Sequence, residues 1–141
     1  MNIGQCIEQG LLKRAAPDIG KAEQSLKVSS ARLAKAKKLL SAGFTDDAAV
    51  SAYAAMFHAA RALLYRDGFK ERSHYALYIY ISEKYVDDME PRFINELDSL
   101  REQRHELMYS LNPPQISESE ARQIISVAND FASATKKMLG L

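Results

Sequence analysis

The chain has little of several residue types that mark particular protein classes. Its 141 residues include one cysteine, Cys6, which excludes an intrachain disulfide and a cysteine-based zinc cage and fits a reducing compartment. The six glycines form no GxGxxG or Walker pattern, so phosphate-binding loops of these kinds are excluded. No serine stands between the glycines of a nucleophile elbow, which excludes the hydrolases built on that turn.

Net charge and long apolar runs are also scarce. With 19 basic and 18 acidic residues the formal charge is +1, so any binding of nucleic acid must depend on a local cluster. No apolar run approaches the roughly 18 residues that span a bilayer. Gln5, Glu8 and Gln9 interrupt the start of the chain, where a signal peptide would have its apolar core. We therefore expect a cytoplasmic protein that makes no membrane contact.

The chain does contain helical periodicity. Its 47% hydrophobic residues are enough to form the core of one domain over residues 1–141. Thr45 and Ser73 are expected N-caps, Pro91 suits a first helical position, and Ser117 with Glu120 forms a capping box. The expected helices cover residues 3–15, 18–42, 45–68, 73–85, 91–109 and 117–139. The fourth segment is rich in β-formers, so a strand is its alternative. The expected fold class is all-α, an antiparallel up-and-down helical bundle of four main helices plus one or two short helices.

The segment 45–68 is the most apolar of the six. Tyr53, Phe57, Arg61 and Leu64 follow helical spacing within it, and eight alanines would let neighbouring helices approach closely. We therefore expect this segment to be the central helix of the bundle.

Arg104 interrupts the apolar stripe of segment 91–109. At about 100° per residue, the apolar side chains of this helix gather in one sector. They are Phe93, Leu97, Leu100, Leu107 and Met108. Because an unmatched buried guanidinium is costly, Arg104, near the middle of that sector, should face a carboxylate, a subunit interface or an anion such as phosphate.

Arg101, His105 and Tyr109 are four residues apart and form a polar stripe beside Arg104. The two arginines could hold a phosphodiester, His105 could exchange a proton, and Tyr109 could donate a hydrogen bond or stack on a base. This set suits RNA cleavage without a metal, in which the ribose 2′-hydroxyl attacks the adjacent phosphate. The structural alternative is that Arg104 bonds a carboxylate from another helix.

Three further residues are candidates for contact with RNA or a nucleotide. His58 and His74 could line a groove, although His58 could equally lie on the rim of the central helix and His74 in the first turn of the next one. Arg61 lies inside an apolar stripe and either pairs with a carboxylate or contacts a ligand. The histidines form no HExxH-like pattern, so we expect no metal site.

The arginine stretch and the central helix together resemble the HEPN (higher eukaryotes and prokaryotes nucleotide-binding) domain family. Its members are short helical bundles with a motif of Arg, then often Asn, His or Asp, then a few residues to a His. The run Arg104-His105-Glu106-Leu107-Met108-Tyr109 resembles this motif with Tyr in the last position, as in one small prokaryotic branch. The run from Ser51 to Leu64, followed by Ser73-His74, resembles the central helix and histidine of that branch. The resemblance covers about residues 25–139.

The resemblance implies a homodimer in which two motif helices meet, so that Arg104 of each subunit lines a shared cleft. Many HEPN proteins are metal-independent ribonucleases, often toxins of toxin–antitoxin pairs that a nucleotidyltransferase neutralises, and others only bind nucleotides or act as scaffolds. Tyr109 stands where the motif usually has His. A phenol has a pKa of about 10 and is therefore a poorer base than imidazole. His105 is the substitute base nearest to it. By analogy, Tyr109 is also an expected modification site.

Three hypotheses follow for the function. The first is a HEPN-like dimer that binds RNA or a nucleotide at an Arg104-centred cleft and acts as an endoribonuclease toxin without any cofactor. Its catalytic residues would be Arg104, His105 and Tyr109, and its binding residues Arg101, Arg61, His58 and His74. The second is a non-catalytic interaction module that docks a nucleotidyltransferase or another protein partner. The third, a metal-binding bundle enzyme, is the least favoured by the spacing of the histidines.

Overall fold

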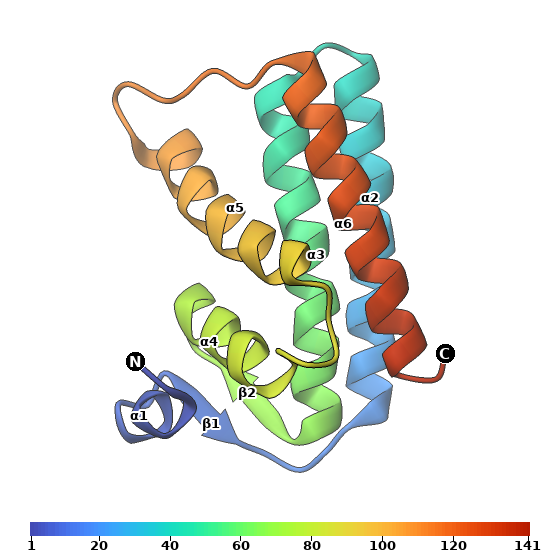
Figure 1. Ribbon diagram of the computed structural model, residues 1–141. Coiled ribbons are helices and arrows are strands. Elements are labelled where there is room, and N and C mark those ends of the chain that lie inside the picture. Colours follow the sequence, from blue (N-terminus) through green and yellow to red (C-terminus); the bar gives the residue numbers. More distant parts are fainter.

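The computed structural model describes residues 1–141 and confirms an up-and-down helical bundle (Figure 1). Its elements are α1 (Ile3–Glu8), β1 (Leu12–Arg14), α2 (Ile19–Ser41), α3 (Thr45–Asp67), β2 (Phe69–Glu71), α4 (His74–Lys84), α5 (Pro91–Tyr109) and α6 (Glu118–Met138). Helices α2, α3 and α6 lie side by side, and α2 runs opposite to the other two. Helix α5 runs opposite to α3 and slopes away from α6 toward its own C-terminal end. This slope leaves the last turns of α5 at the edge of the bundle.

Helix α3 is the buried centre of the bundle, as its alanines predict. Seven of these alanines are at most 2% exposed: Ala48, Ala49, Ala52, Ala55, Ala59, Ala60 and Ala62. Side chains this small let α2 and α6 pack closely against the α3 backbone. Two serine hydroxyls of α2 donate directly to α3 carbonyl oxygens, Ser25 to His58 and Ser29 to Ala55, each at 2.6 Å. These bonds anchor α2 to the central helix.

A hydrogen-bond network around Asp67 ties the C-terminal end of α3 to α4 and α6. Tyr80 and Tyr85 both donate to Oδ2 of Asp67. Arg66 donates to the Tyr85 hydroxyl at 2.7 Å and to the Met138 carbonyl oxygen at 2.8 Å. Burial, reinforced by the bond to Asp67, raises the pKa of both tyrosines, so they remain protonated donors.

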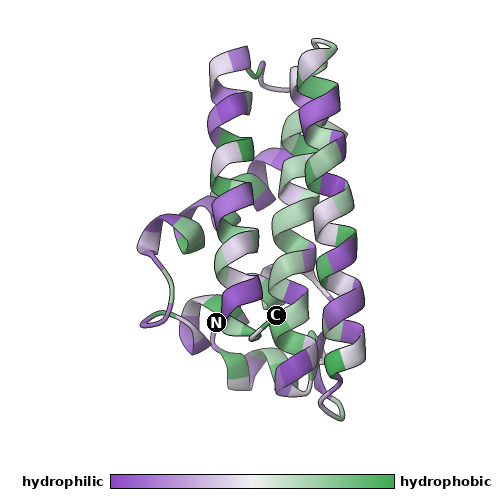
Figure 2. Cartoon of the chain, turned by 90° about the vertical axis from the view of Figure 1, so that its right-hand side faces the viewer, coloured by the Kyte–Doolittle hydropathy of each residue, from purple (hydrophilic) through white to green (hydrophobic).

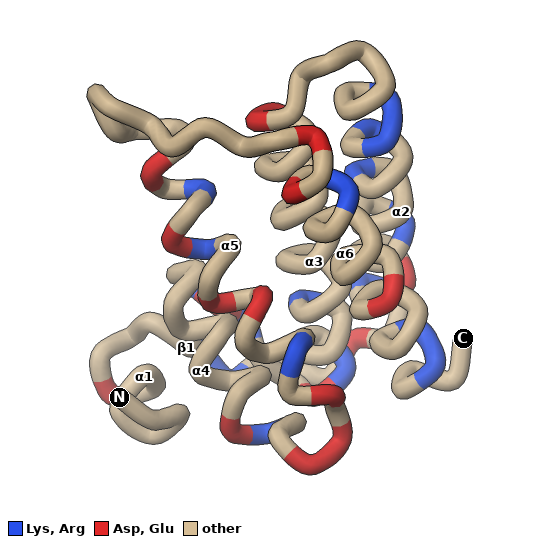
Figure 3. The backbone as a smooth tube through the Cα atoms, turned by 45° about the horizontal axis from the view of Figure 1, so that its top comes forward, with Lys and Arg blue, Asp and Glu red and all other residues tan.

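The outward faces of the helices are polar, and hydrophilic and hydrophobic residues alternate around the outer helices (Figure 2). Helix α2 is the most basic, and its Lys and Arg residues recur along its length (Figure 3). Helix α5 carries both signs of charge along its length. None of the helices combines the length and the apolar character that crossing a membrane requires.

The expectation of one helix over residues 3–15 is wrong in its second half. Helix α1 ends at Glu8, and Gly10 then adopts a positive φ of 73°. Residues 12–14 form a strand that pairs antiparallel with residues 69–71, with Leu12 opposite Glu71. Leu12 is 1% exposed, so burial of its side chain holds the strand against the bundle.

The other expected helix ends are largely confirmed. Ser73 and Ser117 each accept a backbone N–H in the first turn of the following helix, and Pro91 is the first residue of α5. The segment after Ser73 is a helix and not the alternative strand. Thr45 is not the cap of α3: it is the first helical residue, and Phe44 precedes it without a side-chain cap.

Gly68 and Gly43 offer a matched test of how the N-terminal segment packs. Both follow a helix with φ of 86°, but a Cβ at Gly68 would lie 2.8 Å from the Ala15 carbonyl oxygen, whereas one at Gly43 would meet nothing. We expect Gly43→Ala to lower the free energy of unfolding by about 1 kcal/mol, the cost of a left-handed alanine. Gly68→Ala should cost roughly 1–3 kcal/mol more, because the overlap must be relieved. Urea unfolding of both variants measures the difference, and equal losses would contradict the close approach.

Candidate functional site

Arg104 lies on α5 as a half-buried cation without a carboxylate partner. Its guanidinium carbon is 5.7 Å from the centre of the Tyr53 ring of α3, within the range of a cation–π contact. Its Nη1 atom has only a weak contact with Met108 Sδ, at 3.6 Å. Its Nε atom is buried and has no hydrogen-bond partner. The hydrogen-bonding capacity of this side chain is therefore largely unused.

The other half-buried arginines are each paired. They are Arg61 with Glu71 at 2.6 Å, Arg66 with Asp67 at 3.2 Å, and Arg101 with Asp98 at 2.8 Å. Of the two outcomes considered for Arg61, the structure shows the ion pair. For Arg104 it shows no such pair within the chain, so the expected alternative of a carboxylate from another helix is not what this chain has.

Tyr53 and His74 form a hydrogen-bonded pair next to Arg104. The Tyr53 hydroxyl lies 2.8 Å from Nδ1 of His74. Burial raises the pKa of Tyr53 to about 12, so its hydroxyl remains protonated at pH 7. Burial, with the charges of Arg104 and Arg61 next in importance, lowers the pKa of His74 to about 4. His74 is therefore neutral at pH 7, so its ring can stack or form hydrogen bonds but carries no charge.

A small pocket opens beside His74, at the N-terminal end of α4. It has a volume of about 260 Å³ and is lined by Phe57, Arg61, Glu71, Arg72, Ser73 and His74; we call it the His74 pocket. The rings of Phe57 and His74 are 4.3 Å apart, and the Arg61 guanidinium carbon lies 5.3 Å from the Phe57 ring. Helices α3 and α4 and strand β2 thus bring Arg61 and His74 together close to Arg104.

His58 lies in a different pocket from His74. That pocket, of about 230 Å³, is lined by Lys21, Gln24, Ser25, Val28, His58, Arg61 and Tyr65. Burial, followed by the charges of Arg61 and Arg32, lowers the pKa of His58. Arg61 lines both pockets, so it is the residue that links His58 to the His74 pocket.

His105 and Tyr109 lie on the exposed C-terminal part of α5. Their ring centres are 5.0 Å apart, and Tyr109 is 63% exposed. Arg101, one turn earlier, bonds Asp98 and lies over the Tyr75 ring at 5.3 Å. Arg104 shares helix α5 with Arg101, His105 and Tyr109. Within one chain the rings of His105 and Tyr109 stay exposed.

Two residues of the site were missed from the sequence. Tyr53 had a detectable signal, because it lies four residues before Phe57 and eight before Arg61, on one face of a helix. Glu71 had none, because its approach to Arg61 depends on β2, which the sequence pattern does not reveal.

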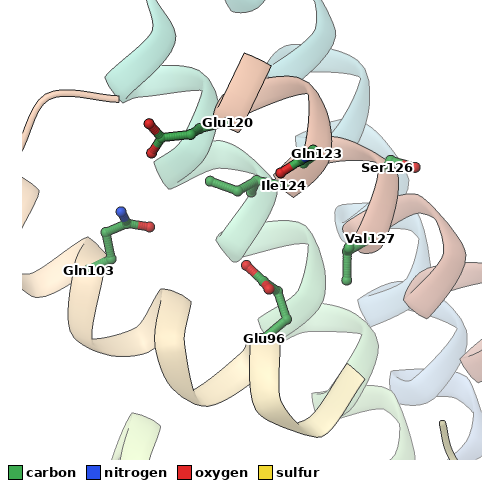
Figure 4. Close-up of a pocket in the computed structure, with 7 residues that line it drawn as sticks. All are labelled: Glu96, Gln103, Glu120, Gln123, Ile124, Ser126 and Val127. Atoms are coloured by element: carbon green, nitrogen blue, oxygen red, sulfur yellow. The ribbon is translucent and has the colours of Figure 1, made fainter. Parts of the chain in front are cut away.

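A further cavity, of about 410 Å³, contains none of the expected site residues. It lies between α5 and α6 and is lined by Glu96, Gln103, Glu120, Gln123, Ile124, Ser126 and Val127 (Figure 4). Burial raises the pKa of Glu96. No group of three or more His, Cys, Asp or Glu side chains in the structure is placed to hold a metal ion.

Comparison with known proteins assigns the family. Residues 11–138 match the HEPN domain. The chain belongs to the HEPN family. This HEPN chain is also 31% identical over 120 residues to "Putative toxin MJ0605" of Methanocaldococcus jannaschii, across 81% of the chain and 85% of that protein. The family resemblance seen in the sequence is confirmed, and the match begins earlier than residue 25, before strand β1.

In this HEPN domain we expect His74 to remain neutral down to about pH 4, because burial and nearby arginines disfavour its charged form. Between its usual pKa of 6.5 and pH 4, the unfolded chain binds a proton that the folded chain does not. The free energy of unfolding therefore falls as the pH falls through this window, and His74→Gln should reduce that loss. A titration followed by the NMR signal of the His74 ring measures the pKa directly.

Two substitutions on α5 separate the causes of this shift. Arg104→Gln removes the largest charge effect on His74, so the pKa of His74 should rise toward its usual value. Arg92→Gln removes the same charge from the same helix, but Arg92 pairs with Glu90 and Asp130 and should leave His74 unchanged. A wild-type His74 that titrates near pH 6.5 would contradict the arrangement.

Proposed function

We propose that this HEPN protein is a homodimeric, metal-independent endoribonuclease that binds RNA in a cleft around Arg104 and acts as the toxin of a toxin–antitoxin pair. The observation that carries the proposal is the half-buried guanidinium of Arg104, which lacks a carboxylate although every other half-buried arginine has one. A phosphate would satisfy these free donors with charge-assisted hydrogen bonds. The name of the Methanocaldococcus jannaschii relative supports the toxin role.

The chemistry requires no group beyond those on α5 and the RNA itself. The ribose 2′-hydroxyl attacks the adjacent phosphorus and gives its proton to His105, while the bond to the 5′-oxygen breaks. Tyr109, whose ring lies 5.0 Å from that of His105, supplies the proton that the leaving 5′-oxygen takes up. Arg104 stabilises the negative charge that gathers on the phosphate oxygens. The products are a 2′,3′-cyclic phosphate and a 5′-hydroxyl.

A dimer would complete this site. Beyond Arg104, α5 and the following loop expose apolar side chains: Met108 is 51% exposed and Leu111 is fully exposed. A two-fold contact between the C-terminal parts of two α5 helices would cover these side chains and place one Arg104 near the other. The repulsion between two guanidinium groups is then relieved by a phosphate bound between them.

The same exposed apolar side chains, Met108 and Leu111, favour the second candidate function. They offer a surface on which a nucleotidyltransferase antitoxin, or another protein partner, could dock while the HEPN domain itself cleaves nothing. In a toxin pair, docking here would also cover the RNA site. The two functions are distinguished by whether the protein, free of any partner, cleaves RNA.

Replacing Arg104 tests the proposed activity. We expect the purified protein to cleave single-stranded RNA of mixed sequence in the presence of EDTA, as followed on denaturing gels. Arg104→Ala should lower the cleavage rate roughly 100- to 1,000-fold, the usual effect of removing a group that stabilises developing charge. Arg92→Ala removes the same charge from a surface pair on α5 and should retain the full rate. Equal rates in wild type and Arg104→Ala would refute the proposal.

Replacing Met108 tests the dimer. Met108→Asp places a charge in the proposed interface and should convert the dimer into a monomer, as measured by light scattering at micromolar concentration. Val86→Asp is the matched control, because Val86 is 53% exposed but lies on the connection between α4 and α5. A wild-type monomer would show that Arg104 lines no shared cleft.

A further inference from the structure

The His74 pocket has the size of a binding site for a single base. Its volume of about 260 Å³ is slightly below the range of roughly 300–1,000 Å³ typical of sites for whole small ligands. One wall is aromatic, with the Phe57 and His74 rings 4.3 Å apart, and the Arg61–Glu71 ion pair also lines the pocket, with the Arg61 guanidinium carbon 5.3 Å from the Phe57 ring. An aromatic wall beside polar groups is the usual arrangement for stacking an unpaired base and bonding its edge.

Glu71 leaves one buried oxygen atom in this pocket without a partner. The residue is 6% exposed, Arg61 Nε donates to its Oε1 atom at 2.7 Å, and Arg61 Nη2 lies 2.6 Å from the same oxygen in the ion pair. Its Oε2 atom is buried and accepts no hydrogen bond. An unsatisfied buried carboxylate oxygen is costly, so the pocket favours a ligand that brings N–H donors. The last torsion of a glutamate side chain is soft, so a small rotation can present Oε2 to such a ligand.

The ion pair presents a donor next to an acceptor. Arg61 has five N–H groups, of which the one on Nε donates to Glu71 Oε1, so further donors remain, and Glu71 offers Oε2. Among the RNA bases, guanine has a carbonyl oxygen, O6, beside two adjacent donors, N1–H and the 2-amino group. Adenine and cytosine place a single amino donor beside an acceptor nitrogen, and uracil has one donor between two acceptors. Only guanine matches the ion pair along its whole edge.

We propose that the His74 pocket binds a guanine base of the RNA, with Glu71 accepting from N1–H and the 2-amino group and Arg61 donating to O6. This inference rests on the proposed binding of RNA at Arg104 and names the base that the same site selects. Arg104 lies over Tyr53, and Tyr53 bonds His74, so the anion site and the base pocket are adjacent. Because His74 is neutral, it stacks on the base without adding a positive charge. Such a charge would attract any polyanion, whatever its bases.

Three nucleotides that each carry a single 5′-phosphate, and differ only in the base, test the base preference on the unmodified protein. We expect guanosine 5′-monophosphate to bind roughly tenfold more tightly than adenosine 5′-monophosphate, the discrimination typical of a matched base edge. Inosine 5′-monophosphate lacks the 2-amino group and should bind with intermediate affinity. Calorimetry measures the affinities, and the NMR signal of the His74 ring reports whether the pocket is occupied. Equal affinities, or an unperturbed His74 signal, would overturn the proposal.

A substitution of Glu71 provides the second test. Glu71→Gln turns one acceptor into a donor and should reduce the preference for the guanine nucleotide over the adenine nucleotide to less than roughly threefold, with adenine binding retained. Glu8→Gln makes the same change at an exposed site on α1 and should keep the full preference. If Glu71→Gln does not fold, the inosine comparison on the wild type decides alone.

The two proposals fail in different ways. Loss of the guanine preference, with RNA cleavage still dependent on Arg104, would remove the base assignment and leave the ribonuclease. A guanine preference that depends on Glu71, without any RNA cleavage, would remove the ribonuclease and leave a site that binds guanine nucleotides.

Discussion

The close packing of α3 against α2 and α6 is the constraint on which the rest of the structure depends. Seven buried alanines bring the backbones near enough for serine hydroxyls of α2 to bond α3 carbonyl oxygens. With alanine on the packed faces, the large side chains of α3 are left for its remaining side. Tyr53, Phe57 and Arg61 lie there at four-residue intervals, facing α4 and α5. The packing that forms the core therefore also forms one wall of the site.

Of the three arginines that act on His74, one has no carboxylate partner. Arg61, Arg101 and Arg104 all act on His74, and carboxylates pair with the first two. The chain has a formal charge of +1, so attraction of an anion depends on this local arrangement and not on an overall field. Because Arg104 is half-buried, its interaction with a bound phosphate is screened less than that of a surface arginine. Burial first, and these positive charges second, keep His74 neutral.

The two short strands have a role out of proportion to their length. Pairing of β1 with β2 holds Glu71 beside Arg61, and the turn at Gly68 lets the chain pass close to Ala15. Ser73 then begins α4, which brings His74 to the hydroxyl of Tyr53. The HEPN match includes β1, so the strand pair is part of the domain.

The sequence by itself determined the main helices, their order and the family, because periodicity, caps and the run from Arg104 to Tyr109 are local features. It could not reveal strands of three residues, which are too short for a period and whose paired residues lie 55 to 59 positions apart. Nor could the sequence distinguish the environment of Arg61 from that of Arg104, because both residues lie in apolar stripes. Only the tertiary structure decided between them: β2 carries a carboxylate to Arg61 and none reaches Arg104, because ion pairing depends on distance in space and not along the chain.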